Sequence, residues 1–133
     1  IGPKDLEKGS VFSARRDIKA KAALAMDGLP ATVAALLETI QKDLFEAAKA
    51  RREANSYRNV TSYDQLKEIM DGPGGFVYAG WNGDPAVEAK VKEETKATIR
   101  CIPDPEFRSA DAPKTCLITG EPAKHEVIWA KAY

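Results

Sequence analysis

This chain of 133 residues lacks the marks of several special protein classes. It has no apolar run near the roughly 18 residues that a membrane-spanning helix needs. Its N-terminus also lacks the basic, apolar and small-residue succession of a signal peptide. Two cysteines, Cys101 and Cys116, are too few for a secreted disulfide framework, and neither has a partner at CxxC spacing. We therefore expect a cytoplasmic globular protein with buried, reduced thiols.

An excess of charge of one sign is also lacking, because 20 basic and 20 acidic residues cancel. The distribution is nevertheless uneven. Residues 1–26 hold six basic against three acidic side chains, and the remainder carries the opposite excess. A basic leading edge can attract the phosphate backbone of a nucleic acid, or it can be an ordinary solvated surface. The sequence leaves both interpretations open.

Recognisable catalytic patterns are missing as well. We find no Ser/His/Asp arrangement and no glycine-rich phosphate loop that follows a strand and opens a helix. The glycines within residues 72–75 follow a helical pattern, so we interpret them as a helix stop and turn rather than a phosphate cradle. We therefore expect no enzymatic activity from this chain alone.

The first 26 residues predict a short helical turn and two strands. Residues 4–9 fit a helical turn that ends at Gly9, and residues 10–17 suggest a strand that continues into a second, weaker one. Two strands cannot make a domain alone, and the chain does not begin with methionine. We expect this segment to be the end of a domain whose beginning lies outside the sequence.

A long helix is predicted from about residue 30 to residue 55, where apolar residues recur at three- and four-residue steps. Pro30 suits its first turn, and Glu38 and Lys42 form a favourable i,i+4 pair. About 26 residues at a rise of 1.5 Å span about 39 Å. A helix of this length can join two domains.

Two more helices are predicted in the rest of the chain. Ser62 with Gln65 three residues later forms a capping box ahead of an apolar pattern. Asp84 followed by Pro85 is typical of a helix start, and we expect that helix to continue to about residue 96 and to bury Val87 and Val91.

Strand patterns alternate with these helices. Apolar segments at 76–81, 98–102 and 125–132 predict strands, with a short additional one around 115–118, and a Pro- and Asp-rich loop covers 104–115. Trp129 is expected to be a core residue. The order of elements predicts an α+β fold of two layers, in which helices cover one face of a mixed four-stranded sheet.

Three separate motifs resemble the C-terminal end of prolyl-tRNA synthetases of the archaeal and eukaryotic-like type. IGPKDLEKG at 1–9, with ARRD at 14–17, is similar to the close of that family's anticodon-binding domain. EETKATIRCIP at 93–103 resembles its C-terminal signature, and the chain ends on AKAY as those enzymes commonly do. The resemblance implies that 1–26 belongs to the anticodon-binding α/β domain, 27–55 to a connecting helix and 56–133 to the C-terminal, zinc-type domain.

The same resemblance implies a degenerate zinc site. The family's C-terminal domain commonly binds zinc through a Cys-Gly-Asp-Pro-x-Cys motif and a later Cys-x-x-Cys motif. In this chain the ligand positions become Asn82, Val87, Cys116 and Thr119. Only Cys116 keeps a donor that zinc prefers, so we expect a domain that folds without zinc. Val87 is our candidate for filling the space that the metal left.

For RNA, the resemblance implies binding of the anticodon stem-loop of the proline tRNA. Lys4, Asp5 and Lys8 would face the anticodon, while Arg15 and Arg16 would contact phosphates. Each of these residues could instead be an ordinary solvated surface charge.

The resemblance also describes the parent enzyme, a homodimeric class II ligase that joins proline to its tRNA with ATP and Mg²⁺. Its catalytic domain would lie upstream of Ile1. Tyr133 would fold back toward that domain near the active site, or it would be an ordered edge residue. The competing hypothesis is a free-standing RNA-binding or protein-interaction module, and a start codon directly before Ile1 would favour it.

Overall fold

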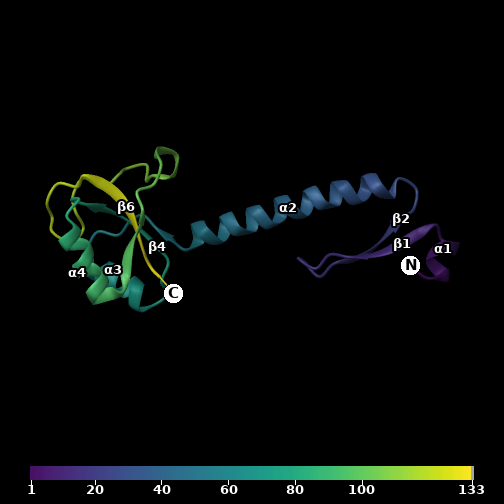
Figure 1. Ribbon diagram of the computed structural model, residues 1–133, viewed down its shortest axis with the longest axis horizontal. Helices are drawn as coiled ribbons and strands as arrows, with labels where there is room; N and C mark the ends of the chain where they lie inside the picture. The colour runs from purple at the N-terminus through teal and green to yellow at the C-terminus, as the bar shows by residue number, and fades with distance from the viewer. Residues whose placement is uncertain (133) are drawn as a thin grey trace. The chain divides into compact units, whose positions relative to one another are not determined.

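The computed structural model describes residues 1–132. Its contacts divide the chain into two compact units, unit 1 at Ile1–Arg51 and unit 2 at Arg52–Tyr133 (Figure 1). No helix among the residues described has an apolar stretch that could cross a membrane.

Unit 1 consists of a helical turn, a hairpin and most of a long helix. The helix α1 (Pro3–Glu7) precedes the strands β1 (Ser10–Ala14) and β2 (Lys21–Ala25). The two strands pair antiparallel over their whole length, from Ser10 opposite Ala25 to Ala14 opposite Lys21. The predicted turn and strand pair are therefore confirmed, with the reversal placed at residues 15–20.

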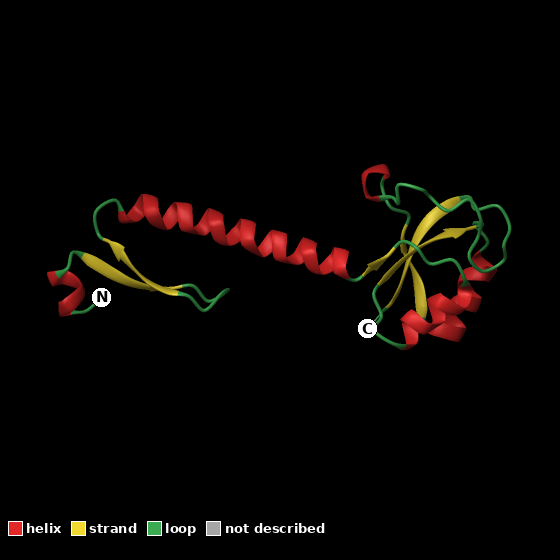
Figure 2. Cartoon of the chain, turned by 180° about the vertical axis from the view of Figure 1, so that it is seen from behind, coloured by secondary structure: helices red, strands yellow, loops and turns green. Residues whose placement is uncertain are grey.

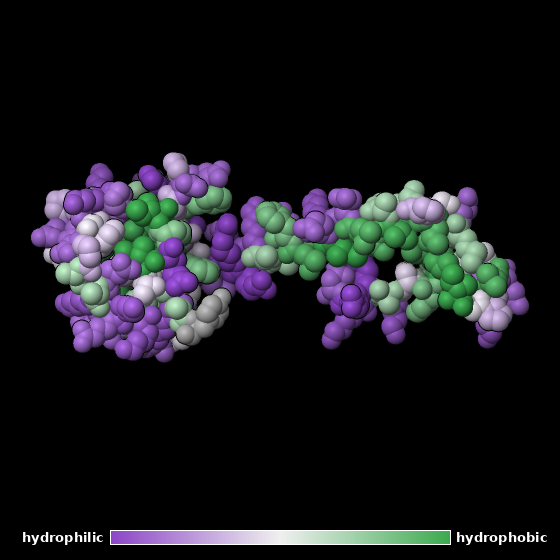
Figure 3. Space-filling view, in the orientation of Figure 1, coloured by the Kyte–Doolittle hydropathy of each residue, from purple (hydrophilic) through white to green (hydrophobic). Residues whose placement is uncertain are grey.

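The long helix α2 (Leu29–Ala54) confirms the prediction to within one residue at each end. Its apolar stripe does not become a core, because no residue of unit 1 is buried. Phe12 on β1 and Leu37 on α2 are 62% and 60% exposed. Hydrophobic side chains accordingly run along the surface of α2 (Figure 3).

Unit 2 is built on a four-stranded sheet. Its strands are β3 (Ser56–Tyr57), β4 (Phe76–Trp81), β5 (Ala97–Cys101) and β6 (His125–Lys131), and their order is β3-β4-β6-β5. The first pair is parallel and the other two pairs are antiparallel. The helices α3 (Tyr63–Asp71) and α4 (Pro85–Thr95) lie on one face, and loops cover the other (Figure 2). The predicted α+β fold with a mixed sheet is confirmed.

The fourth strand is not where the sequence placed it. The segment around 115–118 contributes only an isolated bridge between Thr115 and Pro122. It cannot extend into a strand because it turns back at once, with the Gly120 N–H donating to the Cys116 carbonyl at 2.9 Å. The fourth strand is β3, which precedes α3 and which the sequence pattern did not reveal.

The starts of both short helices follow their caps. Ser62 Oγ accepts the Gln65 N–H at 3.2 Å, as a capping residue should. The Gln65 side chain, however, accepts the backbone N–H of Thr61 at 2.8 Å, one residue before the expected partner. Asp84 Oδ1 accepts the Ala86 N–H at 2.8 Å and so caps α4.

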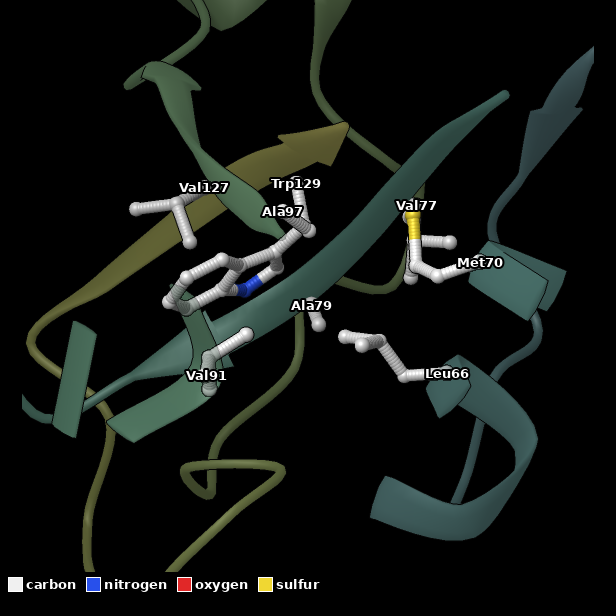
Figure 4. Packing of buried hydrophobic residues seen from close by; sticks show 8 residues of the cluster. All are labelled: Leu66, Met70, Val77, Ala79, Val91, Ala97, Val127 and Trp129. Carbon is white, nitrogen blue, oxygen red and sulfur yellow. The ribbon is translucent and has the colours of Figure 1, made fainter. Parts of the chain in front are cut away.

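The core lies between the helices and the sheet (Figure 4). Trp129 on β6 is fully buried, as the sequence predicted, and its indole lies against Val91 of α4 while Leu66 reaches in from α3. Burying a side chain of this kind contributes about 1.5–3 kcal/mol. The cluster comprises Leu66, Met70, Val77, Ala79, Val91, Ala97, Val127 and Trp129.

The opposite face of the sheet is covered by the loop segment 102–124, which we call the covering loop. The Leu117 N–H donates to the Gly80 carbonyl at 3.0 Å, and the Ser109 N–H donates to the buried Glu126 carboxylate at 3.0 Å. A Cβ atom at Gly80 would lie only 2.1 Å from the carbonyl oxygen of Thr115. Glycine at this position therefore allows the covering loop to cross the sheet at close range.

Replacing Gly80 with alanine is expected to lower the free energy of unfolding of unit 2 by about 1–3 kcal/mol, the usual cost of overpacking. Urea denaturation followed by tryptophan fluorescence measures this loss. Adding Ala123→Gly removes the next obstacle, a methyl group 3.0 Å from the new atom. It should not restore stability, because the main clash is with backbone. A G80A variant as stable as the parent chain would contradict the close crossing.

Candidate functional site

The three residues predicted to face the anticodon lie at one end of the hairpin. Lys4 is exposed and Asp5 is half-buried on α1, and Lys8 directly follows this helix. The Asp5 carboxylate accepts the Gly2 N–H at 2.8 Å and so caps the helix start. The two lysines form no ion pair with any described residue, so their charges remain available to a ligand.

Arg15 has a structural environment that the sequence did not reveal. Its guanidinium binds the carboxylate of Asp17 and, at 2.7 Å, that of Asp43 on α2. These hydrogen bonds raise the pKa of Arg15 and lower the pKa of Asp17. Arg15 thus joins the hairpin to the long helix, and its charge is already matched. Its neighbour Arg16 is exposed at the turn.

The five predicted RNA-binding residues do not form one cluster. Lys4, Asp5 and Lys8 lie before the start of β1, whereas Arg15 and Arg16 follow its end. A strand of this length spans about 17 Å at 3.4 Å per residue. The structure therefore contains two separate basic positions in unit 1. The other predicted site residue, Tyr133, lies outside the described residues.

Two of the four predicted zinc-motif positions, Asn82 and Thr119, share a hydrogen-bond partner that the sequence did not suggest. Glu121 Oε2 accepts the Asn82 side-chain amide at 2.7 Å and the Thr119 hydroxyl at 3.2 Å. Asn82 Oδ1 in turn accepts the Asp84 N–H at 3.1 Å. A carboxylate thus links the two segments that contain the predicted zinc-motif positions. Glu121 stands two residues beyond the zinc-motif pattern, so the motif gave no signal for it.

Cys116 belongs to the same group and is 2% exposed. Burial by itself raises the pKa of its thiol, but hydrogen bonds from the Thr119 hydroxyl and from nearby backbone N–H groups outweigh burial. The net pKa of Cys116 is therefore lowered. Cys101, at the end of the edge strand β5, is exposed, so the expectation that both thiols are buried was wrong for this one. It lies just before Pro103, where the edge strand leaves the sheet.

These donors do not fit a zinc site. Zinc prefers thiolate, imidazole or carboxylate ligands in a tetrahedral set, whereas the four motif positions offer one thiol, an amide, a hydroxyl and the apolar Val87. Val87 is buried in the first turn of α4. Within residues 1–132 no group of three or more His, Cys, Asp or Glu side chains is placed to hold a metal ion.

A cavity of about 490 Å³ lies beside Cys116 and Gly80, and one of about 400 Å³ borders α3. Residues 58–60 line both. The Arg58 guanidinium lies over the Tyr78 ring at 3.7 Å and donates to the Phe107 carbonyl at 3.3 Å. It also pairs with Glu53 at 3.5 Å, where α2 ends. Arg58 therefore holds the sheet, the covering loop and the end of α2 together, which is a structural task.

Replacing Glu121 with alanine is expected to lower the free energy of unfolding of unit 2 by about 1 kcal/mol, because Asn82 and Thr119 lose their shared acceptor. Glu121→Gln keeps an acceptor oxygen and should retain most of this stability. Glu106→Ala, on the exposed part of the covering loop, is the matched control and should change nothing. Urea denaturation of the three variants measures the difference, and equal stability of E121A and E106A would contradict the linking role of Glu121.

Comparison with known proteins gives a consistent result. The family model described as "Prolyl-tRNA synthetase, C-terminal" matches residues 63–133. The proline–tRNA ligase of Chlorobium phaeobacteroides (strain BS1) is 46% identical over 138 residues, which cover all of this chain and 28% of the relative. The proline–tRNA ligase of Flavobacterium johnsoniae is 44% identical over 133 residues, covering all of this chain and 26% of that protein.

A proline–tRNA ligase 2 of Bacillus thuringiensis (strain Al Hakam) is 42% identical over 133 residues, again covering the whole of this chain and 27% of the relative. The chain thus spans a little over a quarter of the length of the relatives that it matches. Its family model covers unit 2 from the start of α3 onward. The chain therefore belongs to the family of prolyl-tRNA synthetase C-terminal domains.

Proposed function

We propose that this chain is the noncatalytic C-terminal part of a proline–tRNA ligase of the archaeal and eukaryotic-like type, an enzyme that joins proline to its tRNA with ATP. The observation that carries this proposal is the match of all 133 residues to proline–tRNA ligases, of which they form a little over a quarter. The adenylate-forming chemistry, with its ATP and Mg²⁺, belongs to the remaining three quarters. The cytoplasmic setting and the homodimer of the parent are part of the same proposal.

In this proposal residues 1–26 complete the anticodon-binding domain, and residues 27–55 form the connecting helix. The exposed apolar side chains of unit 1 support this role. Phe12 on β1 is 62% exposed and Leu6 on α1 is 61% exposed, although both are large hydrophobic residues. Large apolar surfaces of this kind usually mark an interaction site, and the rest of the anticodon-binding domain is the partner that we propose. Lys4, Asp5, Lys8 and Arg16 would then meet the tRNA anticodon stem-loop.

The C-terminal domain, residues 56–133 in this proposal, supports the catalytic domain without taking part in the reaction. Its core is complete in itself, and its C-terminal strand β6 runs through the middle of the sheet. Because β6 is paired on both sides, it fixes the point from which the C-terminal residues leave the sheet. From that point Tyr133, two residues beyond β6, would reach the catalytic domain.

The zinc site of the family has been replaced in this chain by hydrogen bonds and burial. Support comes from the Glu121 link between Asn82 and Thr119 and from the hydrogen bond between Thr119 and Cys116. Metal-driven folding usually fails when most of the ligands are lost, and an alternative link removes that dependence. Glu121 joins Val87 as a candidate for what took over the role of the metal.

A free-standing RNA-binding or interaction module is the weaker hypothesis. The relatives match the chain along its full length, including the hairpin and α2, and all of those described above are proline–tRNA ligases. An independent module would have no reason to keep unit 1, which buries none of its own residues.

A chimeric enzyme tests the proposed function. The matching segment of the Chlorobium phaeobacteroides ligase is replaced by this chain, and charging of proline tRNA with radioactive proline is measured. We expect the chimera to aminoacylate, because the segments correspond along their whole length. The same enzyme truncated before the segment is the control for its requirement. A chimera that folds but does not charge tRNA would contradict the proposal.

Introducing cysteine at the three motif positions that lack it tests whether the family's zinc site was replaced in this chain. The variant N82C/V87C/T119C, together with the native Cys116, should bind one equivalent of zinc, and its thermal transition should become sensitive to chelator. The single variant T119C is the control and should bind none. The unmodified chain should also contain no stoichiometric zinc. Zinc in the unmodified chain, or a folded triple variant without it, would refute the replacement.

A further inference from the structure

The turn of the β1–β2 hairpin carries a concentrated positive charge that the roles above do not explain. We call residues 15–21 the hairpin tip. It holds four basic side chains and one acidic one. The single acid, Asp17, is bound by Arg15, and Arg15 is also bound by Asp43. The remaining cations, Arg16, Lys19 and Lys21, are exposed and form no ion pair with any residue in 1–132.

The tip is held in a defined position. Arg15 and Asp17 have side chains that are only 15% and 10% exposed, and Asp43 anchors them to α2. The Arg15 N–H donates to the Ala20 carbonyl at 2.8 Å, which closes the turn. Lys19 adopts a left-handed φ of 55° that completes the reversal. The three free cations are therefore displayed by a braced turn. In Figure 3 hydrophilic side chains gather where the hairpin reverses.

The pattern suits a polyanion that also offers apolar surface. Ile18 lies between the cations and is 58% exposed, like the other large apolar side chains of unit 1. Phosphate groups attract lysine and arginine without regard to sequence, and an adjacent apolar side chain can pack on a ribose or base. An acidic protein segment could satisfy the same charges, so the test below distinguishes it from RNA.

We propose that Arg16, Lys19 and Lys21 at the hairpin tip contact the phosphate backbone of RNA, with Ile18 packed on the same strand and Arg15 acting as the brace. The choice of RNA rests on the proposed function, because the relatives are tRNA ligases. The proposal adds two lysines and an isoleucine to the expected RNA surface. It assigns Arg15 to positioning instead of phosphate contact.

The test is a binding titration of the full chain with a fluorescein-labelled anticodon stem-loop of proline tRNA, at several salt concentrations. The tip variant is R16Q/K19Q/K21Q. The matched control is K49Q/K92Q/K114Q, which removes the same charge from three exposed lysines that form no ion pair with a described residue. Circular dichroism verifies that both variants fold like the parent chain. R15Q is measured beside them.

The tip variant should bind about tenfold more weakly or worse, and its slope of log affinity against log salt should fall by about 2, since each phosphate contact on a single strand contributes about 0.7. The control should lose less than half as much. The loss should be equal on a stem-loop with a scrambled anticodon, because phosphate contacts carry no sequence information. R15Q should lower the melting temperature of the chain, while its salt slope should stay near that of the unmodified chain.

Each other outcome has a distinct meaning. If the parent chain binds RNA and the tip variant binds equally well, the inference is wrong while the proposed tRNA role stands. If the parent chain does not bind, the inference falls together with the RNA part of the proposed function. If poly-glutamate binds the tip as tightly as the stem-loop does, the surface recognises acidic chains in general and the assignment to RNA is overturned.

Discussion

The close crossing of the covering loop over Gly80 is the contact on which the rest of unit 2 depends. With only a hydrogen on its Cα, Gly80 lets the Thr115 carbonyl approach the sheet, and the Leu117 N–H then bonds to the Gly80 carbonyl. This contact fixes the turn that holds Cys116. It also brings Glu121 to Asn82, although the two are 39 residues apart in the chain. Asn82 and Thr119 thus stay together through backbone contact and a shared carboxylate.

The two units differ in whether they bury their apolar side chains. Unit 2 places Trp129 and its neighbours between two helices and a sheet, so its own hydrophobic core stabilises it. Unit 1 leaves Phe12 and Leu37 on the surface and buries no residue. Its internal order comes from strand pairing and from the pair between Arg15 and Asp43. This contrast accords with a chain that spans about a quarter of the length of the relatives that it matches.

Much of the fold was predictable because its signals are local. The caps Ser62 and Asp84 set the starts of α3 and α4, and the apolar period set α2. What the sequence did not reveal depends on contacts between distant segments. The strand β3 has two residues and exists only through pairing with β4. Glu121 gains its role from Asn82, and Arg15 loses its free charge to Asp43, and neither partner is close in sequence.

Native-state hydrogen exchange of the intact chain tests the central claim most directly, namely that unit 2 is self-sufficient and unit 1 depends on an outside partner. The amides of Leu117 and Lys124, which bond to Gly80 and Trp81, should exchange only through global unfolding, as core amides do. The hairpin amides of Val11 and Ser13, which face β2, should exchange by local opening at much lower free energy. Equal protection in the hairpin, or rapid exchange at Leu117, would contradict the claim.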